Sequence, residues 1–118
     1  MSGITTHVLD TARGKPAAGV PVVLEVLDVL DPDSPRWRRL GEAVTDDDGR
    51  AKRLPPEGTA LVPGTYRITF ATAVYFRAQE IEGFYPEAAI VFEVRDAAQH
   101  YHVPLLLSPY GYSTYRGS

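Results

Sequence analysis

Apolar residues in this chain recur at every second position, in short runs that Gly, Pro and Asp interrupt. Side chains alternate between the two faces of a β-strand, so this period is typical of strands with one buried face. The pattern therefore predicts an all-β sandwich. The expected strands span residues 4–9, 20–29, 37–44, 66–70, 88–94, 101–107 and 112–115, with a short strand near Ala51.

One segment departs from the alternation. Residues 71–79, ATAVYFRAQ, contain the helix formers Ala, Arg and Gln and predict a helix of barely two turns, too short to be stable without tertiary contacts. The Asp-Gly pair in TDDDGR, residues 45–50, predicts a turn, and LPPEGTALVPG, residues 54–64, predicts a loop. No repeat or linker divides the 118 residues, which we expect to form a single domain, 1–118.

Composition argues against several classes of partner. Lys and Arg number 12 against 15 Asp and Glu, a net charge of −3, and the basic residues are scattered, so we expect no nucleic-acid partner. The chain has no Cys, which excludes disulfides and thiolate metal sites. The first ten residues do not resemble a leader, and no apolar run approaches the roughly 20 residues that span a bilayer. We therefore expect a soluble, cytoplasmic protein with no membrane partner.

Alternation also sorts the histidines. In the first strand, Thr5 and His7 lie on the face opposite the expected core face. In the closing stretch, one face is strongly apolar, and the opposite face carries His100, His102, Pro104 and Leu106. Pro104 lacks an amide hydrogen, so we expect it at a sheet edge or at a position whose amide faces outward. The histidines are thus predicted to point away from the core.

Three stretches resemble known functional motifs but lack residues that those motifs require. A calcium loop built on DDDG would need an acidic residue where Val44 stands and a Glu where Pro55 stands. GYSTY lacks the second Gly of a nucleophile elbow, because Tyr115 occupies that position. His100 and His102 would lie about 7 Å apart on one strand face, without the HExxH or Cys partners of a zinc site. We therefore expect no metal and no cofactor.

Three stretches carry a family resemblance: TTHVLDTARGKPAAGVPVVL, TDDDGR and HYHVPLLLSPYGYSTYRGS. Together they resemble the transthyretin-related 5-hydroxyisourate hydrolases, over about residues 4–118, with the terminal YRGS as the most specific part. The resemblance implies a transthyretin-like sandwich of two four-stranded sheets with one short helix. It also implies a homotetramer, a dimer of dimers with active sites at the dimer–dimer interface, in which the last strand pairs with its own copy.

The resemblance further implies an activity. In that family, 5-hydroxyisourate is hydrolysed at a cyclic amide bond to 2-oxo-4-hydroxy-4-carboxy-5-ureidoimidazoline during urate breakdown, without a metal. The implied catalytic residues are His7, Arg50, His102 and Ser118, and the implied substrate-binding residues are His7, Arg50, Tyr115, Arg116 and Gly117.

Each implied role suits the chemistry of its residue. Neutral imidazole, with a pKa of about 6.5, can accept a proton from water near neutral pH, so we expect His102 to activate water with His7 assisting. The fork of donors on Arg50 can bind urate-like carbonyls and stabilise developing negative charge. His100 is predicted to be structural or peripheral.

Two other functions remain open from the sequence. A protein of the transthyretin kind would bind an aromatic hormone in the same channel without catalysis, and a structural sandwich would have no small-molecule site. The resemblance favours the hydrolase, because the hormone carrier lacks the combination of two histidines, the arginine and the YRGS end.

Overall fold

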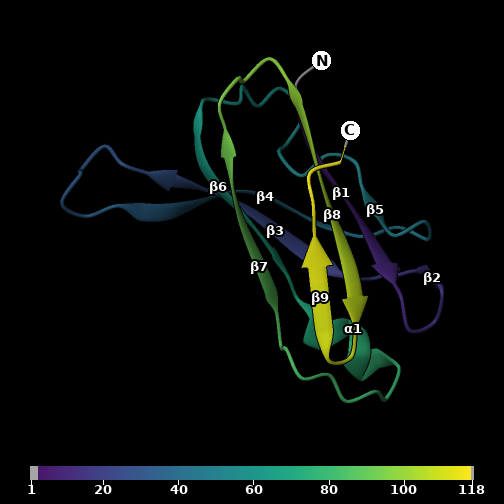
Figure 1. Ribbon diagram of the computed structural model, residues 1–118. Coiled ribbons are helices and arrows are strands. Elements are labelled where there is room, and N and C mark those ends of the chain that lie inside the picture. The colour runs from purple at the N-terminus through teal and green to yellow at the C-terminus, as the bar shows by residue number, and fades with distance from the viewer. Residues whose placement is uncertain (1–2, 118) are drawn as a thin grey trace.

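The computed structural model describes residues 3–117 and forms a sandwich of two β-sheets with one helix (Figure 1). The elements are β1 (Gly3–Asp10), β2 (Lys15–Pro16), β3 (Pro21–Asp28), β4 (Arg36–Val44), β5 (Arg50–Ala51), β6 (Gly64–Phe70), α1 (Thr72–Ala78), β7 (Ala88–Val94), β8 (His100–Ser108) and β9 (Gly111–Thr114).

The sheet topology confirms the predicted sandwich. One sheet has the order β4-β3-β6-β7 and the other the order β2-β1-β8-β9, with β5 paired to β1 beside β2. The second sheet therefore contains one short strand more than the predicted four. The extra strand is β2, which was not predicted because its two exposed residues, one of them Pro16, show no alternation, whereas β5 is the short strand expected near Ala51. No helix among the described residues is long and apolar enough to cross a membrane.

The core lies between the inner faces of the two sheets. Along β1 the side chains alternate strictly between half-buried and buried, and the apolar Ile4 and Val8 are buried. Along β8, Leu105 and Leu107 are at most 1% exposed. This confirms the predicted division of β1 into a core face and an outer face, and that of β8 except at Pro104, which is buried although it alternates with His102.

The parallel pairing of β1 with β8 is the feature that positions the site. The two strands lie side by side and run in the same direction (Figure 1), although almost a hundred residues separate them in the sequence. Thr5 is the Cα partner of His102, and His7 is the partner of Pro104. Residues paired in this way lie on the same face, so both outward sets of polar side chains meet on the outer face of this sheet.

Pro104 explains a gap in the pairing of β8 with the end of the chain. β8 pairs with β9 from Leu105 onward, and a separate bridge joins His102 to Gly117 in the same register. Pro104 lies between these two pairings, opposite Tyr115, and it has no amide hydrogen to give to that neighbour. Its carbonyl oxygen instead accepts a hydrogen bond from the Thr114 hydroxyl, at 2.7 Å.

The single helix, α1, lies at the end of the sandwich to which β8 runs (Figure 1). Its buried side chains are Thr72, Tyr75 and Phe76, which have the spacing of one helix face. The Tyr75 hydroxyl donates to the buried carboxylate of Asp10 at 2.7 Å, and this contact fixes the helix to the end of β1. The structure thus confirms the predicted helix, with residues 71 and 79 as its caps.

Candidate active site

A pocket of about 300 Å³ opens on the outer face of the β1–β8 sheet. Its lining consists of two cationic side chains, two imidazoles and two hydroxyl-bearing residues. These are Arg50, Lys52, His100, His102, Thr5 and Thr6. Among the sequence-predicted residues, the pocket therefore brings together Arg50 and His102.

Arg50 is placed by the turn that precedes it. The Asp46 carboxylate accepts hydrogen bonds from the amide groups of Asp48 and Arg50, at 2.9 and 3.0 Å, and closes the turn. The bond from the Arg50 amide is the main reason why the pKa of Asp46 lies below its usual range. Gly49 has a φ of 76°, and a Cβ there would lie 2.3 Å from the Val8 carbonyl oxygen. Only glycine permits this turn, which sets β5 against β1.

His7 lies beside Arg50 in the sheet. The two residues are Cα partners across β1 and β5. The His7 Nε2 atom is 2.8 Å from the Asp48 carbonyl oxygen. A carbonyl oxygen only accepts, so Nε2 is the protonated nitrogen and donates this bond. In neutral His7, the nitrogen with a free lone pair is therefore Nδ1.

His102 and His100 share one hydroxyl group. The Thr5 Oγ1 atom lies 2.8 Å from His102 Nδ1 and 3.0 Å from His100 Nε2. Both histidines point away from the core, as predicted. His100 lines the pocket together with His102, whereas sequence analysis had set it aside as structural or peripheral. With Nδ1 engaged by Thr5, the nitrogen of His102 left for a ligand is Nε2.

The surroundings of His102 favour its neutral form. Partial burial is the first cause that lowers the pKa of its imidazole below 6.5, and the positive charges of Arg50, His7 and His100 lower it further. His102 therefore keeps a free lone pair at neutral pH. This is the property that a general base requires.

Gly117 lies directly against the His102 ring. Its amide donates to the His102 carbonyl oxygen at 2.8 Å. A Cβ at position 117 would lie 2.5 Å from His102 Cδ2, closer than two such atoms can approach. The glycine of the terminal YRGS is thus needed for this close approach to the imidazole rather than for an unusual backbone conformation.

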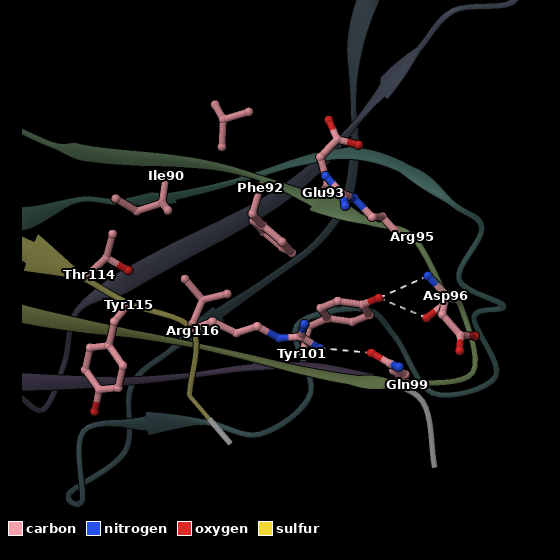
Figure 2. Close-up of a pocket in the computed structure, with 12 residues that line it drawn as sticks. Ile90, Phe92, Glu93, Arg95, Asp96, Gln99, Tyr101, Thr114, Tyr115 and Arg116 are labelled. Carbon is pink, nitrogen blue, oxygen red and sulfur yellow. Dashed lines mark hydrogen bonds between the residues drawn. The ribbon is translucent and has the colours of Figure 1, made fainter.

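Arg116 lies apart from the histidines. Its guanidinium group is 4.7 Å from the centre of the Tyr101 ring and donates to the Gln99 side-chain oxygen at 3.0 Å (Figure 2). These residues line a second hollow of about 600 Å³, on the β7 and β9 side of the sandwich. Arg116 is therefore not grouped with Arg50 and His102 within one chain.

The other residues of the terminal tetrapeptide have different positions. The Tyr115 side chain points away from the Arg116–Tyr101 pair in Figure 2 and is 57% exposed. The register places Tyr115 opposite Pro104, at the edge of the histidine face. Ser118, which sequence analysis assigned to the site, lies outside the described residues.

Over residues 3–117, no group of three or more His, Cys, Asp or Glu side chains is arranged to hold a metal ion. Arg50 and Lys52 line the pocket and carry only hydrogen-bond donors. The arrangement suits a planar, electron-rich ligand with several carbonyl oxygens better than it suits a cation.

Sequence analysis missed Thr5, Lys52 and Asp46 as contributors to the site and set His100 aside. Alternation does place Thr5 on the same face as His7, which was a usable signal. Its contact with two histidines depends on the parallel β1–β8 register, which no local pattern in the sequence reveals.

Comparison with known proteins gives consistent matches. The model of the HIUase/Transthyretin family matches residues 4–117. The 5-hydroxyisourate hydrolase of Caulobacter vibrioides is 48% identical over 122 residues, which cover 100% of both chains. The solved 5-hydroxyisourate hydrolase of Klebsiella pneumoniae is 34% identical with a TM-score of 0.83, and 100% of both chains are covered. Sea bream transthyretin, solved in complex with thyroxine, is 30% identical with a TM-score of 0.86, covering 97% of this chain and 93% of its own.

The backbone alone does not distinguish these relatives. The TM-scores to the hydrolase and to the thyroxine-bound transthyretin are 0.83 and 0.86, so an argument about function must rest on side chains. Here the relevant side chains are the imidazoles, the hydroxyl and the guanidinium group that meet on the outer face of β1, β5 and β8.

Proposed function

Since this chain belongs to the HIUase/Transthyretin family, we propose that it hydrolyses 5-hydroxyisourate in urate degradation, opening the ring to 2-oxo-4-hydroxy-4-carboxy-5-ureidoimidazoline. The full-length identity to a 5-hydroxyisourate hydrolase supports the activity. The single structural observation that carries the proposal is the pocket in which His102, with a lowered pKa, lies beside Arg50.

In the proposed reaction, His102 is the general base. Its Nε2 takes a proton from a water molecule whose oxygen attacks the carbonyl carbon of the cyclic amide. The C–N bond then breaks, and the imidazolium returns the proton to the departing nitrogen, so the net change is the addition of one water. Because His102 is neutral at pH 7, it can begin the cycle without first losing a proton.

Arg50 is proposed to stabilise the charge that builds on the attacked carbonyl. Its guanidinium group is permanently charged and offers donors in a fixed plane, so it binds an oxyanion more strongly than a neutral carbonyl oxygen. Lys52 adds a second positive charge at the pocket and would favour an anionic form of the substrate.

His7 is proposed to orient the substrate or the water. Its ring is held by the Asp48 carbonyl oxygen, which leaves Nδ1 to accept a hydrogen bond. Ser118 and Tyr115 are proposed to orient the substrate from the end of the chain. Gly117 and Arg116 are proposed to hold that end in place, Gly117 against His102 and Arg116 through Gln99.

A homotetramer is proposed to complete the site. In one chain, Arg50, Lys52 and His100 are exposed, so the pocket does not exclude water by itself. A second dimer placed over this face would enclose it, and pairing of the edge strand β9 with its copy would cover an open ladder. Dilution to the monomer should then abolish activity, and active monomers in a sedimentation-coupled assay would contradict this assembly. The cytoplasmic location stays a prediction from the sequence.

The experiment that tests the activity follows the ultraviolet absorbance of freshly generated 5-hydroxyisourate. We expect added protein to accelerate the loss of absorbance in proportion to its concentration. Decay at the spontaneous rate would contradict the hydrolase and favour a ligand-binding protein of the transthyretin kind.

A further inference from the structure

The Thr5 hydroxyl forms the only link between two imidazoles in the part of the site that the structure describes. It lies 2.8 Å from His102 Nδ1 and 3.0 Å from His100 Nε2, and it has no further side-chain partner among residues 3–117. A hydroxyl group has one hydrogen to donate. It can therefore donate to only one of the two rings.

Both contacts are hydrogen bonds at the same time only when the Thr5 hydroxyl accepts from one ring and donates to the other. In the first arrangement, His102 carries its proton on Nδ1 and His100 accepts at Nε2. In the reverse arrangement, His100 donates from Nε2 and His102 accepts at Nδ1. The two arrangements differ in the nitrogen of His102 that is left with a lone pair.

The charges around the pocket distinguish the two arrangements. Arg50 from β5 and Lys52 next to it face the pocket and carry donors but no acceptors. His7 from β1 and His100 from β8 are the other titratable groups whose positive charge acts on His102. A lone pair on His102 Nε2 is favoured beside these groups, whereas an N–H there would meet other donors.

Resting on the hydrolase function proposed above, we infer that Thr5 is a positioning residue: its hydroxyl accepts Nδ1–H of His102 and donates to Nε2 of His100, so that Nε2 of His102 remains free to act as the base. These two hydrogen bonds, from His102 to Thr5 and from Thr5 to His100, form an array in which His100 is the terminal acceptor. When His102 takes the proton from water, its Nδ1–H becomes the donor of a charge-assisted bond to Thr5, which is stronger than the bond made by the neutral ring.

The array is assembled by the fold rather than by sequence proximity. Thr5 is the Cα partner of His102 in the parallel register, and His100, two residues earlier, lies on the same face. Gly117 contacts the His102 ring from another side. The imidazole is therefore fixed both in rotation, by the glycine, and in tautomer, by the hydroxyl.

The kinetic test compares Thr5→Val, which keeps the shape and removes the hydroxyl, with Thr5→Ser, which keeps the hydroxyl. We expect Thr5→Val to lower kcat by about 10- to 100-fold, the effect of one charge-assisted hydrogen bond, with little change in KM. The acid limb of the pH–rate profile of Thr5→Val should move to lower pH, because the His102 imidazolium loses the hydroxyl that accepts its Nδ1–H. Thr5→Ser should restore both. A raised KM with unchanged kcat, or a Thr5→Ser variant as impaired as Thr5→Val, would overturn the inference.

The role of His100 is tested in the same assay. His100→Gln can still accept from Thr5 through its side-chain oxygen, whereas His100→Leu cannot. We expect His100→Leu to lower kcat more than His100→Gln does. Equal values for the two variants would contradict His100 as the terminal acceptor.

Nitrogen-15 NMR of the histidine rings provides a test that needs no substrate. At a pH where the rings are neutral, we expect His102 to be the Nδ1–H tautomer in the wild type and to gain Nε2–H population in Thr5→Val. If the protein lacks hydrolase activity and yet shows this tautomer pattern, the array stands and the proposed function fails. If it hydrolyses 5-hydroxyisourate with His102 as the Nε2–H tautomer, the inference about Thr5 fails and the function stands.

Discussion

The inner and outer faces of the β1–β8 pair are formed by alternating residues of the same two strands. On the inner face, Ile4 and Leu105 are buried and belong to the apolar core. On the outer face, Thr5 and His102 are half-buried and join by a hydrogen bond across the same register. A shift of one residue in either strand would exchange the two faces, so the same pairing determines both stability and the site.

The largest change in stability is expected on the inner face. Leu105 is 0% exposed, so Leu105→Ala should lower the free energy of unfolding by about 2–5 kcal/mol through lost burial and the cavity left behind. Val44→Ala, at a side chain that is 61% exposed, is the matched control and should cost no more than about 0.5 kcal/mol. Denaturant unfolding measures both. Equal losses would contradict the assignment of Leu105 to the core.

On the outer face, Arg50→Gln should lower kcat/KM by about 10²- to 10³-fold, the usual effect of removing a donor that stabilises developing charge. It should also alter the pH profile. In the wild type, kcat/KM should be constant above neutrality and fall at a pH below 6.5, because burial and then Arg50 lower the pKa of His102. In Arg50→Gln, the decrease in kcat/KM should begin at a higher pH, because the charge of Arg50 no longer lowers the pKa of His102. A profile that moves in the opposite direction would show that Arg50 does not act on His102.

Gly117→Ala should disturb the outer face without affecting the core. The added methyl group would displace the His102 ring, and we expect kcat/KM to fall by about 10- to 100-fold from the loss of alignment. Gly111→Ala is the control, since a Cβ there meets only the Ser108 hydroxyl, at 3.8 Å. A fully active Gly117→Ala would mean that the position of the imidazole is not set by this contact.

The smallest effect is expected at the turn. Asp46→Ala removes the acceptor that closes the turn before Arg50, and kcat/KM should fall by about 3- to 10-fold. Asp47→Ala changes the neighbouring carboxylate, which forms no hydrogen bond within the described residues, and should leave the rate unchanged. If both variants lose the same activity, the effect comes from the charge of the acidic turn rather than from the position of Arg50.

The alternation of apolar residues predicted the strands, their inner faces and the outward direction of the histidines. It could do so because burial of one face imposes a local period of two. The pairing of β1 with β8 is not local, and neither is the contact of Thr5 with two histidines that follows from it. The direction of the Arg116 side chain could not be predicted from the sequence either, because it depends on contacts with Tyr101 and Gln99.

The resemblance of the sequence to a family supplied the roles of His102 and Arg50, and the pocket that contains both residues supports those roles. It gave no role to Thr5 or Lys52, and it left His100 aside. The pairing of the strands is what adds these three residues to the site.

The outer face is tested most directly at His102. His102→Gln keeps a polar side chain of similar size and removes the base, and the decay of 5-hydroxyisourate should be followed with this variant beside the wild type. We predict that kcat falls by about 10²- to 10⁴-fold while the assembled, folded state is retained, as measured by circular dichroism and sedimentation. A folded and assembled His102→Gln variant that hydrolyses 5-hydroxyisourate at the wild-type rate would contradict the assignment of catalysis to this face.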